Sequence, residues 1–223
     1  MSSTTSADGT TSERAAPGGA LLSVHDLACR RGDRLLFQGL HFELHPGQLM
    51  WVRGPNGRGK TSLLRLLAGL ARPETGRIEG RARPRSGASL YLAHANALKD
   101  DLSALEALQF LARLHGADAG ATACETALRR FGLHGRRHAP VRTLSQGQRR
   151  RVALSRLLMQ PSARLWILDE PFDALDADAS AILNHTLAGH VRGGGAVVLT
   201  SHLDPSLDEL SPVHFHFDEN PLR

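Results

Sequence analysis

A glycine-rich stretch in the first third of the chain has the residue types and spacing of a phosphate-binding loop. Residues 54–61 read G-P-N-G-R-G-K-T, which fits the pattern G-x-x-x-x-G-K-[ST]. Glycines at these positions let the backbone curl so that successive N–H groups point at phosphate oxygens. Phosphate then lies at the positive end of the helix that follows. The residues expected to bind nucleotide here are Gly54, Pro55, Asn56, Gly57, Arg58, Gly59, Lys60, Thr61 and Ser62.

Two side chains of this loop have a specific role in phosphate chemistry. We expect the Lys60 ammonium to face the β- and γ-phosphates of ATP and the Thr61 hydroxyl to coordinate Mg²⁺. The alternative interpretation is a glycine-rich turn with a chance lysine. The strand expected before the loop and the helix expected after it argue against that alternative.

Two adjacent carboxylates mark a second place where phosphate chemistry is expected. Asp169 and Glu170 follow the apolar run 165–168, roughly 110 residues beyond the phosphate-binding loop. A buried strand of a parallel sheet delivers such residues to the C-terminal edge, where α/β proteins bind their ligands. We expect Asp169 to join Thr61 in the Mg²⁺ shell, and Glu170 to orient or deprotonate the attacking water. An isolated Asp–Glu pair is more often just a loop, so the upstream phosphate-binding loop favours the catalytic interpretation.

Three shorter motifs accompany these two sites. The segment 144–148 reads L-S-Q-G-Q, and we expect Gly147 to open a helix whose free amides can take up an anion. Residues 173–176 read D-A-L-D, and residues 200–202 read T-S-H after the last apolar run. Each motif alone is weak evidence, because a polar turn or an exposed histidine explains it as well.

The elements that must position these residues follow from the spacing of apolar side chains. Leu40, Phe42 and Leu44 alternate with polar residues, as in a half-buried strand. Short apolar runs indicate buried strands, and helical spacing or a capping box indicates helices. Buried strands are expected at 49–52, 165–168 and 196–199, and helices from 60 to 69, from 103 onward, at 121–131, at 147–159 and at 177–190. Strands that alternate with helices predict an α/β core with a mainly parallel sheet.

The domain organisation is expected to be simple. Residues 1–20 are mostly Ser, Thr, Gly and Ala and are expected to be a disordered tail, and residues 21–223 to form one ATP-binding domain. Helices between about 95 and 160 are expected to form an inserted subdomain within it. The tail lacks the basic start and apolar block of a secretory signal. We therefore expect a cytoplasmic protein in which Cys29 and Cys124 are free thiols.

Composition restricts the class of protein without fixing its function. The chain has 223 residues, of which 41% are hydrophobic and 22% charged, as in ordinary soluble globular proteins. Its apolar runs are too short to cross a bilayer. A net charge of +5 suits nucleic acid, an anionic membrane leaflet or simply a solvated arginine-rich surface. The run Arg149–Arg151 is interpreted as a solvated helix face, with contact to a partner or to lipid as the alternative.

The order of the motifs resembles that of ABC transporter ATP-binding subunits. The phosphate-binding loop comes first, followed by a signature at 144–148, similar to Leu-Ser-Gly-Gly-Gln with Gln146 at the first glycine. The carboxylate pair, a D-loop at 173–176 and a switch histidine at His202 then follow in order. The resemblance covers about Leu21 to Phe217. It implies a P-loop NTPase core with an N-terminal antiparallel β part and an inserted helical subdomain. It also implies a dimer of ATPase subunits, in which Ser145, Gly147, Gln148 and Asp176 contribute to nucleotide binding and His202 reaches the γ-phosphate.

Two departures from the family pattern affect the nucleotide site. The family stacks adenine on an N-terminal aromatic residue, whereas 29–34 reads C-R-R-G-D-R, where the Arg31 guanidinium is the plane that can stack. The family also has a glutamine after the strand that follows the P-loop helix, and His94 stands there. An imidazole can still donate or accept near a metal-bound water, so His94 joins Glu170 and His202 as a candidate catalytic residue.

The sequence around His94 resembles that of one subfamily. His94, the run Ala97–Lys99 and the run Leu102–Glu106 resemble the ATP-binding subunit of the bacterial cytochrome c maturation system, also called the haem exporter. The resemblance implies that ATP hydrolysis drives a step of haem delivery. It also implies a six-helix membrane subunit and other cytochrome c maturation proteins as partners. The location implied is peripheral, on the cytoplasmic face of the inner membrane.

Three other functions remain as alternatives. One is a transporter ATPase for another cargo, such as a lipid, drug or metal complex. Another is a soluble ABC ATPase acting on nucleic acid or ribosomes. The single P-loop and the lack of a coiled coil before the signature argue against it, so no nucleic-acid partner is expected. The last is a nucleotide kinase, which would not explain the signature or His202.

Overall fold

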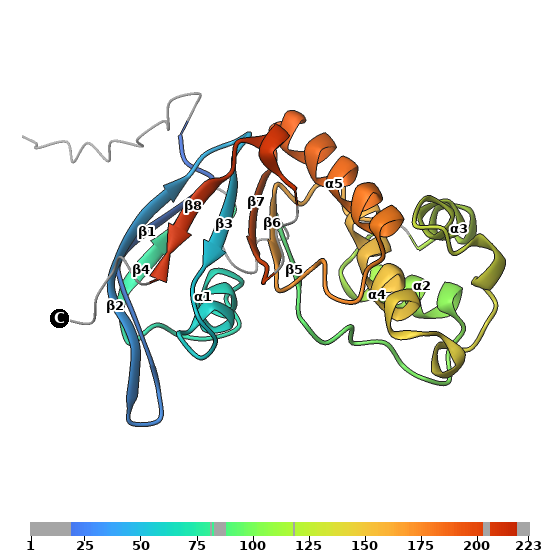
Figure 1. Ribbon diagram of the computed structural model, residues 1–223, viewed down its shortest axis with the longest axis horizontal. Helices are drawn as coiled ribbons and strands as arrows, with labels where there is room; N and C mark the ends of the chain where they lie inside the picture. Colours follow the sequence, from blue (N-terminus) through green and yellow to red (C-terminus); the bar gives the residue numbers. More distant parts are fainter. Residues whose placement is uncertain (1–18, 81, 83–87, 118, 203–205, 218–223) are drawn as a thin grey trace, which may run out of the picture.

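The computed structural model describes residues 19–80, 82, 88–117, 119–202 and 206–217, which form an α/β core beside a group of helices (Figure 1). Residues 1–18, nearly all of the expected tail, lie outside this part. Cys29 and Cys124 are buried and are not joined by a disulfide, as expected. Within the described residues, no helix combines the length and apolar character needed to cross a membrane.

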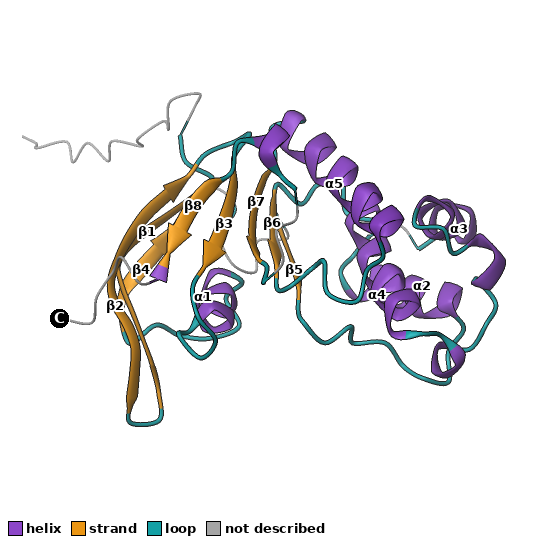
Figure 2. Cartoon of the chain, viewed as in Figure 1, coloured by secondary structure: helices purple, strands orange, loops and turns teal. Residues whose placement is uncertain are grey.

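A parallel sheet of five strands forms the centre of the core (Figure 2). Its strands lie in the order β5 (Ser89–Leu92), β6 (Leu165–Leu168), β7 (Ala196–Thr200), β3 (Leu49–Arg53) and β8 (Val213–His216). All neighbouring strands are parallel. Strands β6 and β7 are buried along their whole length, because both faces of the sheet are covered, which explains their uninterrupted apolar sequences.

A second, antiparallel sheet comes from the N-terminal part of the chain. Its order is β2 (Arg34–Leu44), β1 (Leu22–Arg31) and β4 (Thr75–Glu79). The register pairs Leu22 with Leu44 and Val24 with Phe42, so their apolar side chains share one face. This sheet confirms the antiparallel β part. Strand β2 begins at Arg34, earlier than the alternation at 40–44 indicates.

Helix α1 (Lys60–Leu67) fills the space between the two sheets. Leu63, Leu64, Leu66 and Leu67 are at most 1% exposed and pack with residues of both sheets in one core. The helix ends two residues before Gly69, whose positive φ of 68° takes the chain out of the helical conformation. Helix α5 (Ala177–Arg192) covers the other face of the parallel sheet with Leu183, Leu187 and Val191.

Helices α2 (Ala104–Leu114), α3 (Ala121–Arg130) and α4 (Gln146–Leu154) form a group with its own apolar core, at the end of the molecule far from the antiparallel sheet (Figure 1). The capping box expected at Ser103 and Glu106 starts α2. Short 3-10 helices lie at His134–Arg136, Val141–Thr143, Ser155–Leu158 and Asp208–Leu210.

The helix expected at 147–159 is corrected at both ends. It begins one residue earlier, at Gln146, and its α-helical part ends at Leu154. The chain continues as the 3-10 turn at 155–158, where the Ser155 hydroxyl donates to the carbonyl of Arg151 at 2.9 Å. Such a bond from a serine back into the preceding turn bends a helix, which explains the early end.

Candidate active site

A cleft of about 440 Å³ lies beside the C-terminal ends of strands β3, β5, β6 and β7. This is the edge of the sheet where the sequence places the phosphate chemistry. The residues that line it are Arg31, Leu36, Asn56, Gly57, Gly59, Lys60, Thr61, Ser62, Arg65, His94, Asp169, Glu170 and His202. Leu36 and Arg65 were missed from the sequence, because neither belongs to a motif. Gly54, Pro55 and Arg58 belong to the same loop but do not line the cleft.

The phosphate-binding loop joins β3 to α1 in the expected way. Gly59 precedes the helix with a φ of 106°, a conformation that side chains rarely allow, and a Cβ there would lie 3.1 Å from the Phe37 ring. Lys60 is 8% exposed, and its ammonium donates to the carbonyls of Gly54 at 2.6 Å and Pro55 at 3.2 Å. An ammonium has three N–H donors, so one remains for a phosphate oxygen.

Asp169 and Thr61 offer a pair of oxygens suited to a magnesium ion. Asp169 follows β6, is 3% exposed and accepts a hydrogen bond from the Thr61 hydroxyl at 3.3 Å. Mg²⁺ prefers oxygen ligands, and it is usually bound through one or two protein groups together with water and substrate phosphates. The chemistry and closeness of these two groups therefore fit the expected ion.

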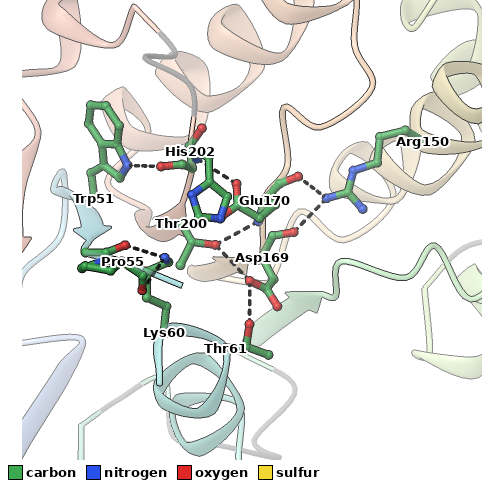
Figure 3. A network of polar contacts seen from close by, with 11 residues as sticks. Trp51, Pro55, Lys60, Thr61, Arg150, Asp169, Glu170, Thr200 and His202 are labelled. Carbon is green, nitrogen blue, oxygen red and sulfur yellow. Dashed lines mark hydrogen bonds and ion pairs between the residues drawn. The ribbon is translucent and has the colours of Figure 1, made fainter. Parts of the chain in front are cut away.

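Thr200, at the end of β7, joins the two carboxylate residues, a role that the sequence did not reveal. Its hydroxyl donates to Asp169 Oδ1 at 2.9 Å and accepts from the backbone N–H of Glu170 at 2.9 Å (Figure 3). The bond to Glu170 fixes a residue whose φ is 49°, in the left-handed region that non-glycine residues seldom adopt. Strained conformations of this kind persist where neighbouring groups hold them.

His202 contacts both carboxylate oxygens of Glu170. Its backbone N–H donates to Oε2 at 3.0 Å, and its Nε2 lies 3.2 Å from Oε1. The Glu170 side chain is 15% exposed and that of His202 is 51% exposed. Trp51 supports this segment through its indole N–H, which donates to the carbonyl of Ser201 at 3.3 Å (Figure 3). The carboxylate is thereby held next to the phosphate-binding loop.

Arg150 corrects the interpretation of the run Arg149–Arg151 as a solvated face. Its side chain is buried and 3% exposed, whereas Arg149 and Arg151 are partly exposed. Consecutive residues of an α-helix point about 100° apart, so three arginines in a row cannot share one face. Burial lowers the pKa of Arg150 to about 10, while the carboxylates of Asp173, Asp169 and Glu170 act in the opposite direction.

His94 and Arg31, the two residues that depart from the family pattern, both line the cleft. His94 follows β5, is exposed and lines the cleft. Arg31 ends β1 and lines the same cleft. The structure therefore brings both residues to the phosphate-binding loop.

Ser145, Gly147 and Gln148 lie outside this cleft. The Ser145 hydroxyl caps α4 by accepting from the N–H of Gln148 at 3.2 Å, and the Gln148 side chain accepts from the N–H of Ser145 at 3.0 Å. Ser145 is exposed, and no acceptor for its hydroxyl proton occurs in the part of the chain that the structure describes, so the hydroxyl can donate to an anion. Gln146 is exposed in the first turn of the helix, which explains why a side chain is tolerated there.

Gly147 of the signature lies against the segment 173–176, the D-loop, which ends at Asp176. A Cβ at Gly147 would lie 2.5 Å from the carbonyl oxygen of Ala174, so this close approach requires glycine. Asp176 does not line the cleft. Its carboxylate caps α5 by accepting from the N–H of Ala179 at 2.8 Å. Its expected contact with nucleotide therefore does not occur within its own chain's cleft.

Comparison with known proteins gives consistent matches. The family model described as ABC transporter matches residues 37–173. A protein of Aromatoleum aromaticum, named cytochrome c biogenesis ATP-binding export protein CcmA, is 49% identical over 86% of this chain and 96% of its own length. Proteins similarly named come from Cupriavidus metallidurans (51% identical, 82% and 90% covered) and Pseudomonas syringae pv. tomato (48% identical, 83% and 90% covered).

Solved structures agree with the fold. An ABC transporter ATP-binding protein from Pyrococcus furiosus superposes with a TM-score of 0.76 at 25% identity, covering 89% of this chain and 98% of that one. The cbiO1 protein of Clostridium perfringens, described as part of the ABC transporter complex cbiONQ, gives a TM-score of 0.66 at 23% identity. It covers 82% of this chain and 79% of its own, and at that identity it supports the fold alone.

Proposed function

The chain belongs to the ABC transporter family and, within it, to the cytochrome c biogenesis ATP-binding export proteins, and we propose that it energises haem delivery to c-type cytochromes. It is the subunit of the transporter that binds and hydrolyses ATP. The observation that carries the proposal is one cleft that gathers the phosphate-binding loop, Asp169, Glu170 and His202 in a chain about half identical to these proteins. The cargo step is inferred from the names of the relatives.

The geometry supports a specific role for each residue of the cleft. Lys60 and the amides of the loop bind the β- and γ-phosphates, and Thr61 and Asp169 would hold Mg²⁺, which would neutralise phosphate charge. Glu170 accepts a proton from a water that attacks the γ-phosphorus in line with the leaving ADP oxygen. His202 keeps the carboxylate oriented, and its exposed ring would contact the γ-phosphate. His94 lines the cleft in place of the usual glutamine and would donate to or accept from a water there.

We further propose that the complete ATP site needs a second copy of the chain. Ser145 and Gly147 do not line the cleft of their own chain, although the start of α4 has the free amides and the hydroxyl that bind an anion. In a dimer, these groups reach the γ-phosphate held by the partner's loop. Gln148 and Asp176 then act at the same interface, in addition to their capping roles.

ABC ATPase subunits work with membrane subunits, and we infer a six-helix one here, with other cytochrome c maturation proteins. In this arrangement the chain is peripheral, on the cytoplasmic face of the inner membrane. The folded part of residues 21–223 acts as one ATP-binding domain, and its helices at about 95–160 form the subdomain that contacts the membrane subunit. No nucleic acid takes part.

Deletion of the gene tests the proposal in the bacterium that encodes it. Haem staining of membrane proteins should lose the c-type cytochromes and keep the b-type ones, because b-type haem is bound without covalent attachment. The wild-type chain should restore the c-type signal, and chains carrying Glu170→Gln or Lys60→Ala should not. Normal c-type staining in the deletion strain would leave an ABC transporter ATPase for a different cargo.

A further inference from the structure

One buried side chain connects three segments that are far apart in sequence. Arg150 comes from the signature helix α4, and its guanidinium lies between the loop after β5 and the turn after β6 (Figure 3). On the first side it donates to the carbonyls of Ala93 and His94 at 3.0 and 3.3 Å, and to Asn96 Oδ1 at 3.0 Å. These contacts fix the loop that carries His94.

On the second side, Arg150 holds the turn that carries the catalytic carboxylate. It donates to the carbonyls of Asp169 at 2.9 Å, Glu170 at 2.8 Å and Pro171 at 3.4 Å. Three successive carbonyls thus converge on one cation. The side chains of Asp169 and Glu170 contact Thr61, Thr200 and His202 in the cleft instead.

Only arginine can satisfy this arrangement. Its planar guanidinium has five N–H donors in a fixed fork, whereas a lysine has three on a flexible stem. Buried carbonyls that lose their donor are costly. Removing the guanidinium therefore releases the turn from the signature helix, while the Thr200 and His202 contacts remain.

Arg150 has a further consequence in the dimer proposed above, in which each ATP lies between the phosphate-binding loop of one chain and the signature of the other, and the inference rests on that dimer. The capping serine Ser145 stands at the start of the same helix, five residues earlier, and serves the nucleotide held by the partner chain. Glu170 serves the nucleotide held by its own chain. We propose that Arg150 is a positioning residue that ties the signature helix to the Glu170 turn and the His94 loop, so that occupancy of one ATP site is transmitted to the other.

The test compares ATP hydrolysis by the chain assembled with its membrane subunit. Arg150→Lys should lower kcat about tenfold to hundredfold, the effect of displacing a catalytic group by about 1 Å, with the KM for ATP nearly unchanged. Asn96→Ala, which removes one acceptor, should lower kcat less. The matched control is Arg151→Met on the same helix, because no side-chain hydrogen bond of Arg151 occurs among the described residues. A normal kcat for Arg150→Lys would overturn the proposal.

A second measurement distinguishes transmission from a simply weakened structure. Ser145→Ala should lower kcat strongly in the wild-type chain. In a chain that already carries Arg150→Lys it should lower kcat only slightly, because the link is already broken. Effects that multiply would mean that the two residues act independently, and the proposal would fail. Thermal unfolding and ATP binding by each isolated chain verify that the variants are folded. Lys60→Ala tests the ATPase itself, since normal turnover in that variant would reject the proposed function instead.

Discussion

His202 contacts the two carboxylate oxygens of Glu170 with two different groups: its backbone N–H donates to Oε2 at 3.0 Å, and its imidazole Nε2 lies 3.2 Å from Oε1. The orientation of Glu170 therefore depends on the chain just after β7. Thr200, in the same segment, accepts a hydrogen bond from the backbone N–H of Glu170. The end of β7 therefore fixes both the backbone and the carboxylate of Glu170. This arrangement leads to the first two predictions.

Glu170→Gln should bind ATP normally and hydrolyse it about 10² to 10⁴ times more slowly, the usual effect of losing a general base. An amide keeps the shape of the side chain but cannot accept a proton from water. ATP should therefore persist between two chains. Gel filtration with ATP should show a dimer of this variant, whereas Lys60→Ala should remain monomeric. A Glu170→Gln chain that stays monomeric with ATP would contradict the sandwich arrangement.

Thr200→Val should lower both stability and kcat. Valine has nearly the same shape but leaves the N–H of Glu170 without its acceptor, which costs about 1–3 kcal/mol in unfolding free energy. Denaturant unfolding measures the stability, and steady-state assays of the assembled complex measure kcat. Thr200→Ser keeps the hydroxyl and serves as the control, so equal losses in both variants would show that the hydroxyl is irrelevant.

Gly147→Ala should impair hydrolysis, while Gln146→Ala should have little effect. A methyl group at position 147 would meet the Ala174 carbonyl at 2.5 Å, so the signature or the D-loop must move. Gln146 is exposed one residue earlier on the same helix. The ratio of the two kcat values in the assembled complex is the measurement, and a ratio near one would mean that the contact does not matter.

Arg31→Ala should raise the KM for ATP about twofold to thirtyfold and leave kcat unchanged. A guanidinium stacked on a ring contributes roughly 0.5–2 kcal/mol, and about 1.4 kcal/mol corresponds to a factor of ten. Arg31→Tyr should restore a low KM, because tyrosine offers the aromatic plane common in the family. Arg30→Ala is the matched control, since Arg30 does not line the cleft and instead donates to the Asp33 carbonyl at 3.0 Å.

The sequence predicted the parts of this site that depend on local motifs. The phosphate-binding loop, Asp169 and Glu170 each follow a short apolar strand, and parallel strands bring their ends to one edge. Thr61 and Asp169 were therefore expected together, and they lie within hydrogen-bonding distance. The family resemblance added the N-terminal antiparallel sheet, which local spacing alone indicated only at 40–44.

The parts that could not be predicted depend on contacts between distant segments. Arg150 looked like one of three surface charges, and only the packing of α4 against the Glu170 turn shows that it is buried. Thr200 was recognised as a neighbour of His202, but its two hydrogen bonds depend on β6 lying beside β7. Neither relationship leaves a spacing or periodicity in the sequence.

The order of strands in the parallel sheet also determines when the ATP site can form during synthesis. Strand β3, which leads into the phosphate-binding loop, pairs only with β7 and β8 in the described sheet, and these strands come roughly 150 residues later. A nascent chain that has emerged only as far as α2 can complete the β2–β1–β4 sheet, but β3 has no strand to pair with. The ribosome must release almost the whole chain before the loop is anchored. Nucleotide binding is therefore expected to appear late in translation, after the signature helix has been made.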